Sequence, residues 1–156
     1  VANFNSHRQI VISGSIPGVR LAMELAKEQR AARAIELVVG GALHSPLMGE
    51  ALSGLTEALA VADIQDSRIP VYTNVTAKPV QDAEEIRSML QKQLLSPVRW
   101  KNTVENMIHD GFDAFYEVGP SKVLIGLSKN INPAADCIPV GKAKDLENLE
   151  SERVQE

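Results

Sequence analysis

The sequence has 156 residues, of which 44% are hydrophobic and 23% are charged, which fits one soluble globular domain or a large piece of one. A formal net charge of −4 argues against a general nucleic-acid binder, because neutralising phosphates needs a clustered basic surface. No apolar run approaches the roughly 20 residues of a membrane helix, and no basic region followed by a hydrophobic block opens the chain, so we expect a cytoplasmic protein without a membrane partner. The single cysteine, Cys137, excludes an internal disulfide and a multi-cysteine metal site.

The beginning of the chain predicts a β-β-α-β order. Residues 1–6 and 9–14 are strand-like segments on either side of a polar turn, which is typical of a hairpin. Pro17 then begins a helix whose apolar positions recur every three or four residues, and a strand is expected over 34–39. This order is about half of a split βαβ module. Because Val1 leads directly into strand-like sequence without an initiator methionine, we expect the polypeptide to be the later part of something longer.

The stretch 37–48 predicts a sharp turn that presents a histidine. An apolar, strand-like run breaks at two glycines, reaches His44 and turns at once into a helix. Ser45 can cap the free N–H groups of the first helical turn, and Pro46 suits the first helical position. Apolar residues then recur at helical spacing down one face: Met48, Leu52, Leu55 and Leu59. We therefore expect the His44 ring at the edge of a sheet, at a strand-to-helix junction.

Strand and helix patterns alternate along the rest of the chain. Strands are expected over residues 70–76, 113–118 and 137–140. Helices are expected over residues 82–94, from Pro97 to Gly111, and over the charged tail 144–156. A further helix is expected after the turn at 119–121, with four apolar residues on one face: Val123, Leu124, Leu127 and Ile131. Alternation of this kind implies right-handed crossovers and a largely parallel sheet, so the predicted fold class is α/β.

A histidine at a strand-to-helix turn is a candidate general base. Imidazole titrates near neutral pH, and the turn leaves one ring nitrogen exposed. Taken alone, however, the pattern around His44 favours a structural or solvated imidazole over a catalytic one by about two to one. His7 lies in the hairpin turn, and His109 lies beside Asp110 near a helix C-terminus, where a cation is favoured. We interpret both of these as structural or solvated.

Two amide side chains stand where amides are unusual. Gln93 continues the apolar stripe of the 82–94 helix, so its side chain is expected to point toward the interior. A buried amide needs hydrogen-bond partners, and it belongs either to a polar site or to a satisfied core. Asn74 lies in the middle of a β-rich run, where asparagine is disfavoured, and poses the same choice. Without further context the structural interpretation is favoured for both.

Five short motifs follow one another along the chain. They are Asn3-Phe4-Asn5-Ser6-x-x-Gln9, Gly41-Ala42-Leu43-His44-Ser45-Pro46-Leu47-Met48, Asn74-Val75-Thr76-Ala77, Gln93-Leu94-x-x-Pro97-Val98-Arg99-Trp100 and Glu117-Val118-Gly119-Pro120. In order and spacing, and as far as about Asn132, they resemble the C-terminal half of the malonyl-CoA:acyl carrier protein transacylase family. Agreement of five motifs is far more specific than any one of them, and it favours a catalytic role for His44.

The resemblance implies an acyltransferase in which an α/β-hydrolase-like large subdomain bears a smaller ferredoxin-like one. Residues 1–38 would be part of the ferredoxin-like subdomain, 39–143 part of the large subdomain, and 144–156 a charged tail. In that family a serine on a Gly-x-Ser-x-Gly elbow attacks the malonyl thioester and forms an acyl-enzyme. The malonyl group then passes from coenzyme A to the phosphopantetheine thiol of acyl carrier protein, in fatty acid biosynthesis, and no cofactor or metal is expected.

By the same resemblance, His44 takes the serine proton and returns one to the leaving thiol, while a backbone carbonyl at the Gln93 position orients the imidazole. Asn74 stands where a second supporting carbonyl or amide is expected. Asn5 matches a motif near the cleft between the subdomains and is a candidate contact of the pantetheine arm. Leu43 replaces the family's usual phenylalanine beside the acyl pocket.

The sequence also departs from the family pattern. It has no Gly-x-Ser-x-Gly, and it lacks the upstream glutamine and the arginine that clamp the malonyl carboxylate. We therefore expect that this chain alone does not catalyse transfer, that its partners are malonyl-CoA, acyl carrier protein and a missing N-terminal half, and that exposed apolar surface makes it self-associate.

Two alternatives stay open. One is an acyltransferase domain fragment of a polyketide or fatty acid synthase, against which the charged, ending tail weighs. The other is a non-catalytic module that docks an acidic carrier protein through exposed cations, which are more simply read as solvated surface. Those cations are Arg20, Lys27, Arg30 and Lys122.

Overall fold

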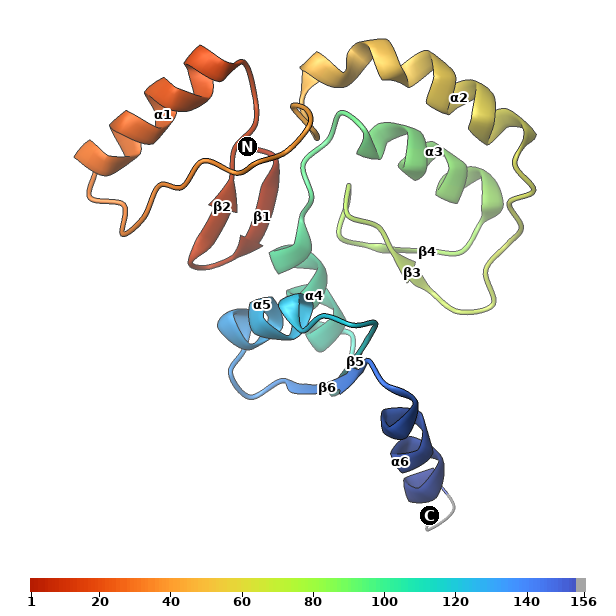
Figure 1. Cartoon of the computed structure of the whole chain (residues 1–156). Coiled ribbons are helices and arrows are strands. Elements are labelled where there is room, and N and C mark those ends of the chain that lie inside the picture. The colour runs from red at the N-terminus through yellow and green to blue at the C-terminus, as the bar shows by residue number, and fades with distance from the viewer. Residues whose placement is uncertain (154–156) are drawn as a thin grey trace.

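The computed structural model describes residues 1–153, with side chains described as far as residue 149, and it has a mixed α/β fold with three limbs (Figure 1). The strands are β1 (Asn3–Ser6), β2 (Gln9–Val11), β3 (Val71–Tyr72), β4 (Pro79–Val80), β5 (Ala114–Val118) and β6 (Asp136–Val140). The helices are α1 (Ile16–Glu28), the 3₁₀ helix η1 (Pro46–Ala51), α2 (Leu52–Val61), α3 (Ala83–Gln93), α4 (Trp100–His109), α5 (Val123–Ile131) and α6 (Ala143–Arg153). The last three residues, which belong to the predicted charged tail, lie outside the described residues.

The N-terminal limb is the predicted hairpin followed by the predicted helix. β1 and β2 pair in antiparallel fashion, with Phe4 opposite Ile10. Helix α1 begins where its capping signals indicate, because the Ser15 hydroxyl accepts a hydrogen bond from the Gly18 N–H at 3.3 Å and Pro17 occupies the first turn. The hairpin and α1 are therefore confirmed.

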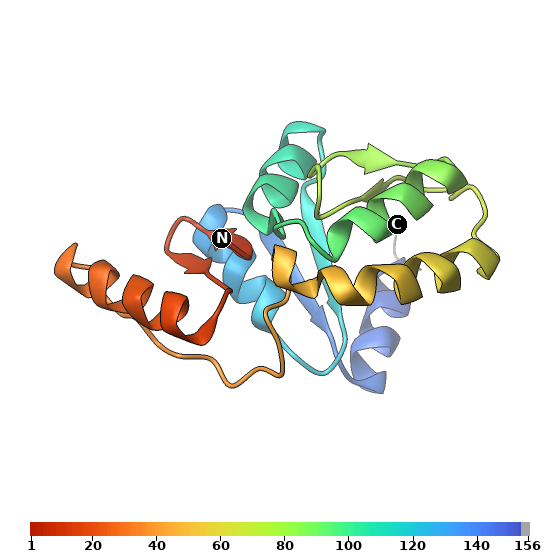
Figure 2. The same ribbon diagram turned by 90° about the horizontal axis from the view of Figure 1, so that it is seen from above.

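The strand predicted over 34–39 is wrong. These residues connect α1 to η1 without regular structure (Figure 2). A strand requires a neighbouring backbone to complete its hydrogen bonds, and none of the described strands pairs with this segment. Its apolar side chains are exposed instead, Val38 completely. The observed order at the start of the chain is therefore β-β-α.

The largely parallel sheet is also wrong for the described part of the chain. Three separate two-stranded sheets are present, and only β5 and β6 are parallel. The strand expected over 70–76 is cut to Val71–Tyr72, because the chain turns through Asn74 and returns as β4. Asn74 is thus a turn residue, where asparagine is common, and not a residue in mid-strand.

Helices α2 and α3 form an antiparallel pair that later carries the candidate site. They lie side by side in both ribbon views (Figures 1 and 2). The predicted stripe of Met48, Leu52, Leu55 and Leu59 is the less exposed face of η1 and α2, which is confirmed. Asp82 caps α3 as predicted, since its carboxylate accepts a hydrogen bond from the Glu85 N–H at 2.8 Å.

The best-buried part of the chain lies where α4 meets β1 and α5. Val104 of α4 is only 1% exposed. Helix α4 begins three residues after Pro97 because Val98 is used as a strand residue: its carbonyl accepts from the Phe4 N–H and its N–H donates to the Ala2 carbonyl, both at 2.8 Å. The helix ends as predicted at Gly111, whose φ of +97° suits glycine.

The C-terminal limb contains the predicted strands β5 and β6 and helices α5 and α6. The buried face of α5 is formed by Ser128 and Ile131, whereas Val123 and Leu124, predicted to share it, are 64% and 41% exposed. These two residues lie in the first turn of the helix, and the buried residues lie in its last turn. No helix within residues 1–153 is long and apolar enough to cross a membrane.

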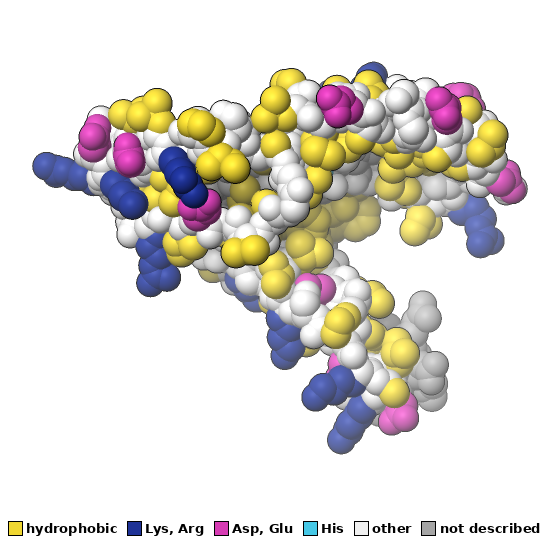
Figure 3. Space-filling view, turned by 45° about the horizontal axis from the view of Figure 1, so that its top comes forward, with side chains coloured by type: hydrophobic (Ala, Val, Ile, Leu, Met, Phe, Trp, Pro, Cys, Tyr) yellow, Lys and Arg dark blue, Asp and Glu magenta, His cyan; other side chains and the backbone are white. Residues whose placement is uncertain are grey.

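We predict that the isolated chain self-associates. Many large apolar side chains are exposed, among them Val38, Val61 and Val118 at 106%, 87% and 80%, and Figure 3 shows hydrophobic side chains over much of one face, including the hollow above the C-terminal helix. Burying such surface is favourable by about 25 cal/mol per Å². Light scattering should detect oligomers at micromolar concentration, and calorimetry should give a broad transition. A monodisperse monomer that melts cooperatively would contradict this.

A second prediction concerns Glu117, whose carboxylate caps α5. Partial burial raises its pKa, but hydrogen bonds from the Ile125 N–H at 2.8 Å, the Ser121 hydroxyl and the Leu124 N–H outweigh burial and leave the pKa below its ordinary value. A lowered folded-state pKa contributes stability above the unfolded pKa and loses it as pH falls through the folded pKa. Wild type should therefore melt above Glu117→Gln at pH 7, and the gap should shrink below about pH 4. A gap that stays constant across this range would refute the assignment.

Candidate active site

The backbone at His44 adopts a conformation that non-glycine residues rarely adopt. Its φ is +58°, in the left-handed region, which costs on the order of 1–3 kcal/mol for such a residue. The neighbouring carbonyls are tied down: Leu43 accepts from the Ser13 hydroxyl at 2.6 Å, and Ala42 accepts from the Ser45 hydroxyl at 2.7 Å. The turn is therefore held from both sides, and it aims the imidazole at the end of α3.

The imidazole of His44 meets a backbone carbonyl. Its Nδ1 lies 3.1 Å from the carbonyl oxygen of Gln93, the last residue of α3. A carbonyl at a helix C-terminus has no partner in the next turn, and here it accepts from the Ser96 N–H at 3.3 Å and from the imidazole. Because a carbonyl can only accept, we assign the proton to Nδ1, which leaves Nε2 with a free lone pair.

The side chain of Gln93 is a second neighbour of the ring. Its Nε2 lies 3.3 Å from His44 Nδ1 and 3.1 Å from the Ser96 carbonyl. The amide NH₂ and a protonated Nδ1 are both donors, so they do not bond to each other in this tautomer. The amide donates to Ser96, and its approach to the ring is packing. The Gln93 amide is therefore a satisfied, half-buried side chain beside the ring.

The electrostatic partner of the ring is a helix end. The C-terminus of α3 carries about half a negative charge, and the ring of His44 lies against it. Among the described residues no carboxylate forms an ion pair with His44, and no cluster of side chains suited to a metal ion occurs. The arrangement can therefore orient the imidazole without a full negative charge beside it.

The other predicted site residues lie farther from the ring or contact different partners. Leu43 precedes His44 and is 48% exposed. The Asn74 carbonyl accepts from the Arg99 N–H at 2.9 Å, and the Asn5 amide donates to the Gln9 side chain at 3.0 Å. Within the described part of the chain, neither asparagine forms a hydrogen bond with His44. The structure thus brings His44 and Gln93 into contact and leaves Asn5 and Asn74 as neighbouring structural elements.

Three supporting residues had not been singled out from the sequence. Ser13 reaches a carbonyl 30 positions away, and nothing in the local sequence points to it. Ser96 receives the Gln93 amide, and the backbone of Arg99 connects the Asn74 turn to the strand-like segment beside β1. The last two lie in the motif that begins at Gln93, so their presence near the site could have been inferred from the motif itself.

A cavity lies at the carboxyl ends of β5 and β6, away from the histidines. Its volume is about 260 Å³, and it is bordered by Lys122, Lys142 and Asp145 among others. None of its lining residues belongs to the His44 turn or to α3. His7, 3.6 Å from Glu105, and His109, at the end of α4, are also separate from the site.

A mixed α/β chain that presents an imidazole with one nitrogen bound and the other free has the geometry of a general base in nucleophilic catalysis. The chain belongs to the acyl transferase domain family, whose model matches residues 1–153.

Several proteins similar to this chain carry the name of the same enzyme activity. The chain is 44% identical over 147 residues to the malonyl CoA-acyl carrier protein transacylase of Bacillus subtilis, a match that covers 94% of this chain and 46% of the relative. It is 41% identical to the transacylase of Haemophilus influenzae, a match that covers 95% of this chain and 47% of that relative. The acyl-carrier-protein-S-malonyltransferase of Bartonella henselae superposes with a TM-score of 0.93 at 36% identity, covering 97% of this chain and 48% of that one. The chain spans about half the length of these relatives.

We predict that Gln93→Ala leaves the tautomer of His44 unchanged. The acceptor is the backbone carbonyl, which every residue supplies, whereas the side chain donates only to Ser96. Two-bond proton–nitrogen spectra of the imidazole should show a proton on Nδ1 in both proteins at neutral pH. A shift of the proton to Nε2 in the variant would mean that the amide, not the carbonyl, sets the tautomer.

Proposed function

We propose that this chain supplies the proton-transfer half of a malonyl-CoA:acyl carrier protein transacylase. The observation that carries the proposal is the 3.1 Å contact between His44 Nδ1 and the Gln93 carbonyl, because a proton held on Nδ1 leaves Nε2 as the basic nitrogen of the ring. The serine nucleophile comes from a segment outside this chain, since these 156 residues contain no Gly-x-Ser-x-Gly.

The proposed reaction has two matched halves. In the first, the serine oxygen attacks the thioester carbonyl of malonyl-CoA while His44 Nε2 takes the hydroxyl proton, and the carbon–sulfur bond breaks as the imidazolium returns that proton to the coenzyme A sulfur. In the second, Nε2 takes the proton of the phosphopantetheine thiol as its sulfur attacks the acyl-serine, and then protonates the serine oxygen as it leaves.

The partners follow from the same proposal. They are malonyl-CoA, acyl carrier protein and the upstream half of the protein. One structural relative, matched at a TM-score of 0.90 and 36% identity, is a malonyl-transacylase solved in complex with a type II PKS acyl-carrier protein. Leu43, exposed beside the base, is placed to border the acyl group, and Asn5 and Asn74 are proposed to shape the cleft that admits the pantetheine arm.

The proposed architecture assigns the limbs to two subdomains. Residues 1–38 would contribute the hairpin and α1 to a ferredoxin-like subdomain, and 39–143 would form part of an α/β-hydrolase-like one. The exposed apolar segment 34–39 supports this, because it has the composition of a strand and no pairing partner in the described residues. In the whole protein we propose that it gains one.

The predicted test is transfer activity after the chain is joined to, or mixed with, its upstream half. His44→Ala should lower the rate of malonyl transfer by about 10²–10⁴-fold, the usual contribution of a general base. His109→Ala, a change at an exposed histidine, should leave the rate unchanged and serves as the matched control. Activity that survives His44→Ala would rule out this base, and binding of carrier protein without any transfer would favour the non-catalytic module instead.

A further inference from the structure

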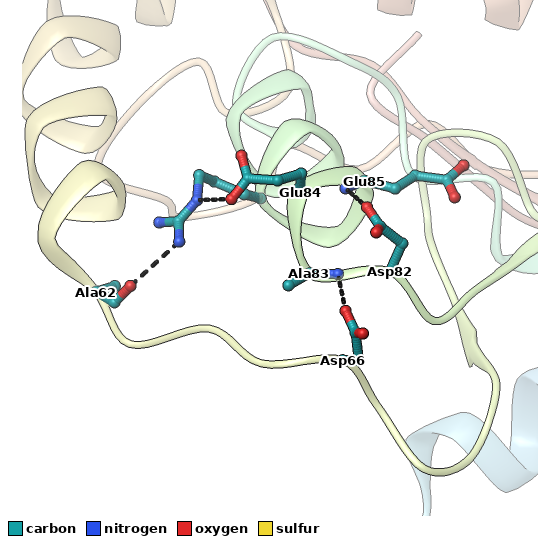
Figure 4. Close-up of polar contacts among 7 residues, drawn as sticks. Ala62, Asp66, Asp82, Ala83, Glu84 and Glu85 are labelled. Carbon is teal, nitrogen blue, oxygen red and sulfur yellow. Dashed lines mark hydrogen bonds and ion pairs between the residues drawn. The ribbon is translucent and has the colours of Figure 1, made fainter.

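An arginine joins α2 to α3 at the end of the helix pair that lies away from His44. Arg87, on α3, donates from Nη2 to the carbonyl of Ala62, the residue that ends α2, at 3.3 Å. Its Nε lies 3.4 Å from a carboxylate oxygen of Glu84, one turn earlier on α3 (Figure 4). The guanidinium thus connects the last carbonyl of one helix to the body of the other.

A second contact lies beside the first. The Asp66 carboxylate, in the connection that follows α2, accepts from the N–H of Ala83 at the start of α3 at 2.8 Å (Figure 4). The backbone of Ser67 also donates to the Gln81 carbonyl, at 2.8 Å. We use "the clamp" for the Arg87–Ala62 and Asp66–Ala83 bonds together. The clamp fixes α3 to the far end of α2.

We propose that Arg87 is a positioning residue for the imidazole of His44, acting through the clamp on the axial register of α3 against α2. The proposal rests on the proposed function. Because the helices are antiparallel, the clamp and the His44–Gln93 contact lie at opposite ends of the pair. Gln93 is six residues beyond Arg87, about 9 Å along the helix axis, so a displacement at Arg87 is carried to the carbonyl by a rigid helix.

The contact at the other end tolerates little movement. A slip of one residue along the axis is about 1.5 Å, and a hydrogen bond is lost when its heavy atoms separate beyond about 3.5 Å. The imidazole–carbonyl distance is already 3.1 Å. Half of a one-residue slip, if it carries the carbonyl directly away from the ring, would exceed that limit, free the ring to rotate and let the proton move to Nε2, where it abolishes the base.

The surroundings of Arg87 indicate that it contributes little net stability to the α2–α3 pair. Its side chain is 18% exposed, and Nη1 is buried without a hydrogen-bond partner in the described residues. Apolar side chains of similar size often replace a buried ion pair without loss of stability, and removing the guanidinium here leaves no buried charge unpaired, because the Glu84 side chain is 80% exposed. Stability and positioning can consequently be separated by substitution, with Arg87→Met as the apolar replacement and Arg87→Lys as the conservative one.

The experiment measures the tautomer of His44, the melting temperature and the transfer kinetics, all in the chain joined to its upstream half. We expect Arg87→Met to melt close to wild type, to show a mixture of imidazole tautomers, and to lose about tenfold to a hundredfold in kcat with KM unchanged, the scale on which misplacement by about 1 Å acts. Arg87→Lys, which can still donate to the Ala62 carbonyl, should restore most of the Nδ1–H tautomer and most of the wild-type kcat. Glu84→Gln keeps that bond and is the matched control.

The two readouts separate this inference from the proposed function. If the wild-type protein transfers no malonyl group, the proposed function fails, and the tautomer still tests the clamp. If Arg87→Met keeps a single Nδ1–H tautomer and a wild-type kcat, the positioning role is overturned. If Arg87→Met does not fold, Asp66→Ala, which removes the other bond of the clamp, must show the same tautomer mixture, and a wild-type tautomer there overturns the role as well.

Discussion

The site depends on one hydrogen bond, from the imidazole Nδ1 of His44 to the backbone carbonyl of Gln93. A carboxylate in that position would add a full negative charge and would itself need burial and partners. The carbonyl instead fixes the tautomer through its acceptor chemistry alone, and the partial negative charge of a helix end supplies the electrostatic support. The bond exists only because α3 ends at this residue, since a carbonyl within the helix would already be occupied.

Everything around this bond serves to place two segments that are 49 residues apart in sequence. On one side, Ser13 and Ser45 hold the turn of His44 in its left-handed conformation. On the other side, the antiparallel pairing of α2 and α3 brings the helix end to the ring. Strain in the turn is tolerated because several independent contacts overdetermine it, which is the usual circumstance of strained residues at functional sites.

Features with a local cause could be predicted from the sequence. The helix starts at Pro17 and Asp82 and the glycine that ends α4 each mark a helix boundary through groups a few residues apart. Pairing between distant segments could not be predicted from the sequence. The sequence does not show that Val98 joins β1 or that Asn74 forms a turn, and the apolar run 34–39 looks like a strand whether or not a partner is present. The contact between His44 and the carbonyl of Gln93 followed from the family resemblance and not from any local pattern.

The two nitrogens of the ring have unequal surroundings, and this inequality shows what the chain contributes to a reaction. Nδ1 is held by the fold, while Nε2 has no hydrogen-bond partner among the described residues. A free base nitrogen on a constrained ring is useful only to a group brought to it from elsewhere. Two exposed apolar side chains, Leu43 and Leu47, lie close to His44 in the sequence. Apolar surface around a base excludes water when a second surface covers it, and an uncovered base of this kind would be solvated and unselective. The arrangement fits the proposal that this chain forms one wall of a cleft and supplies the oriented base.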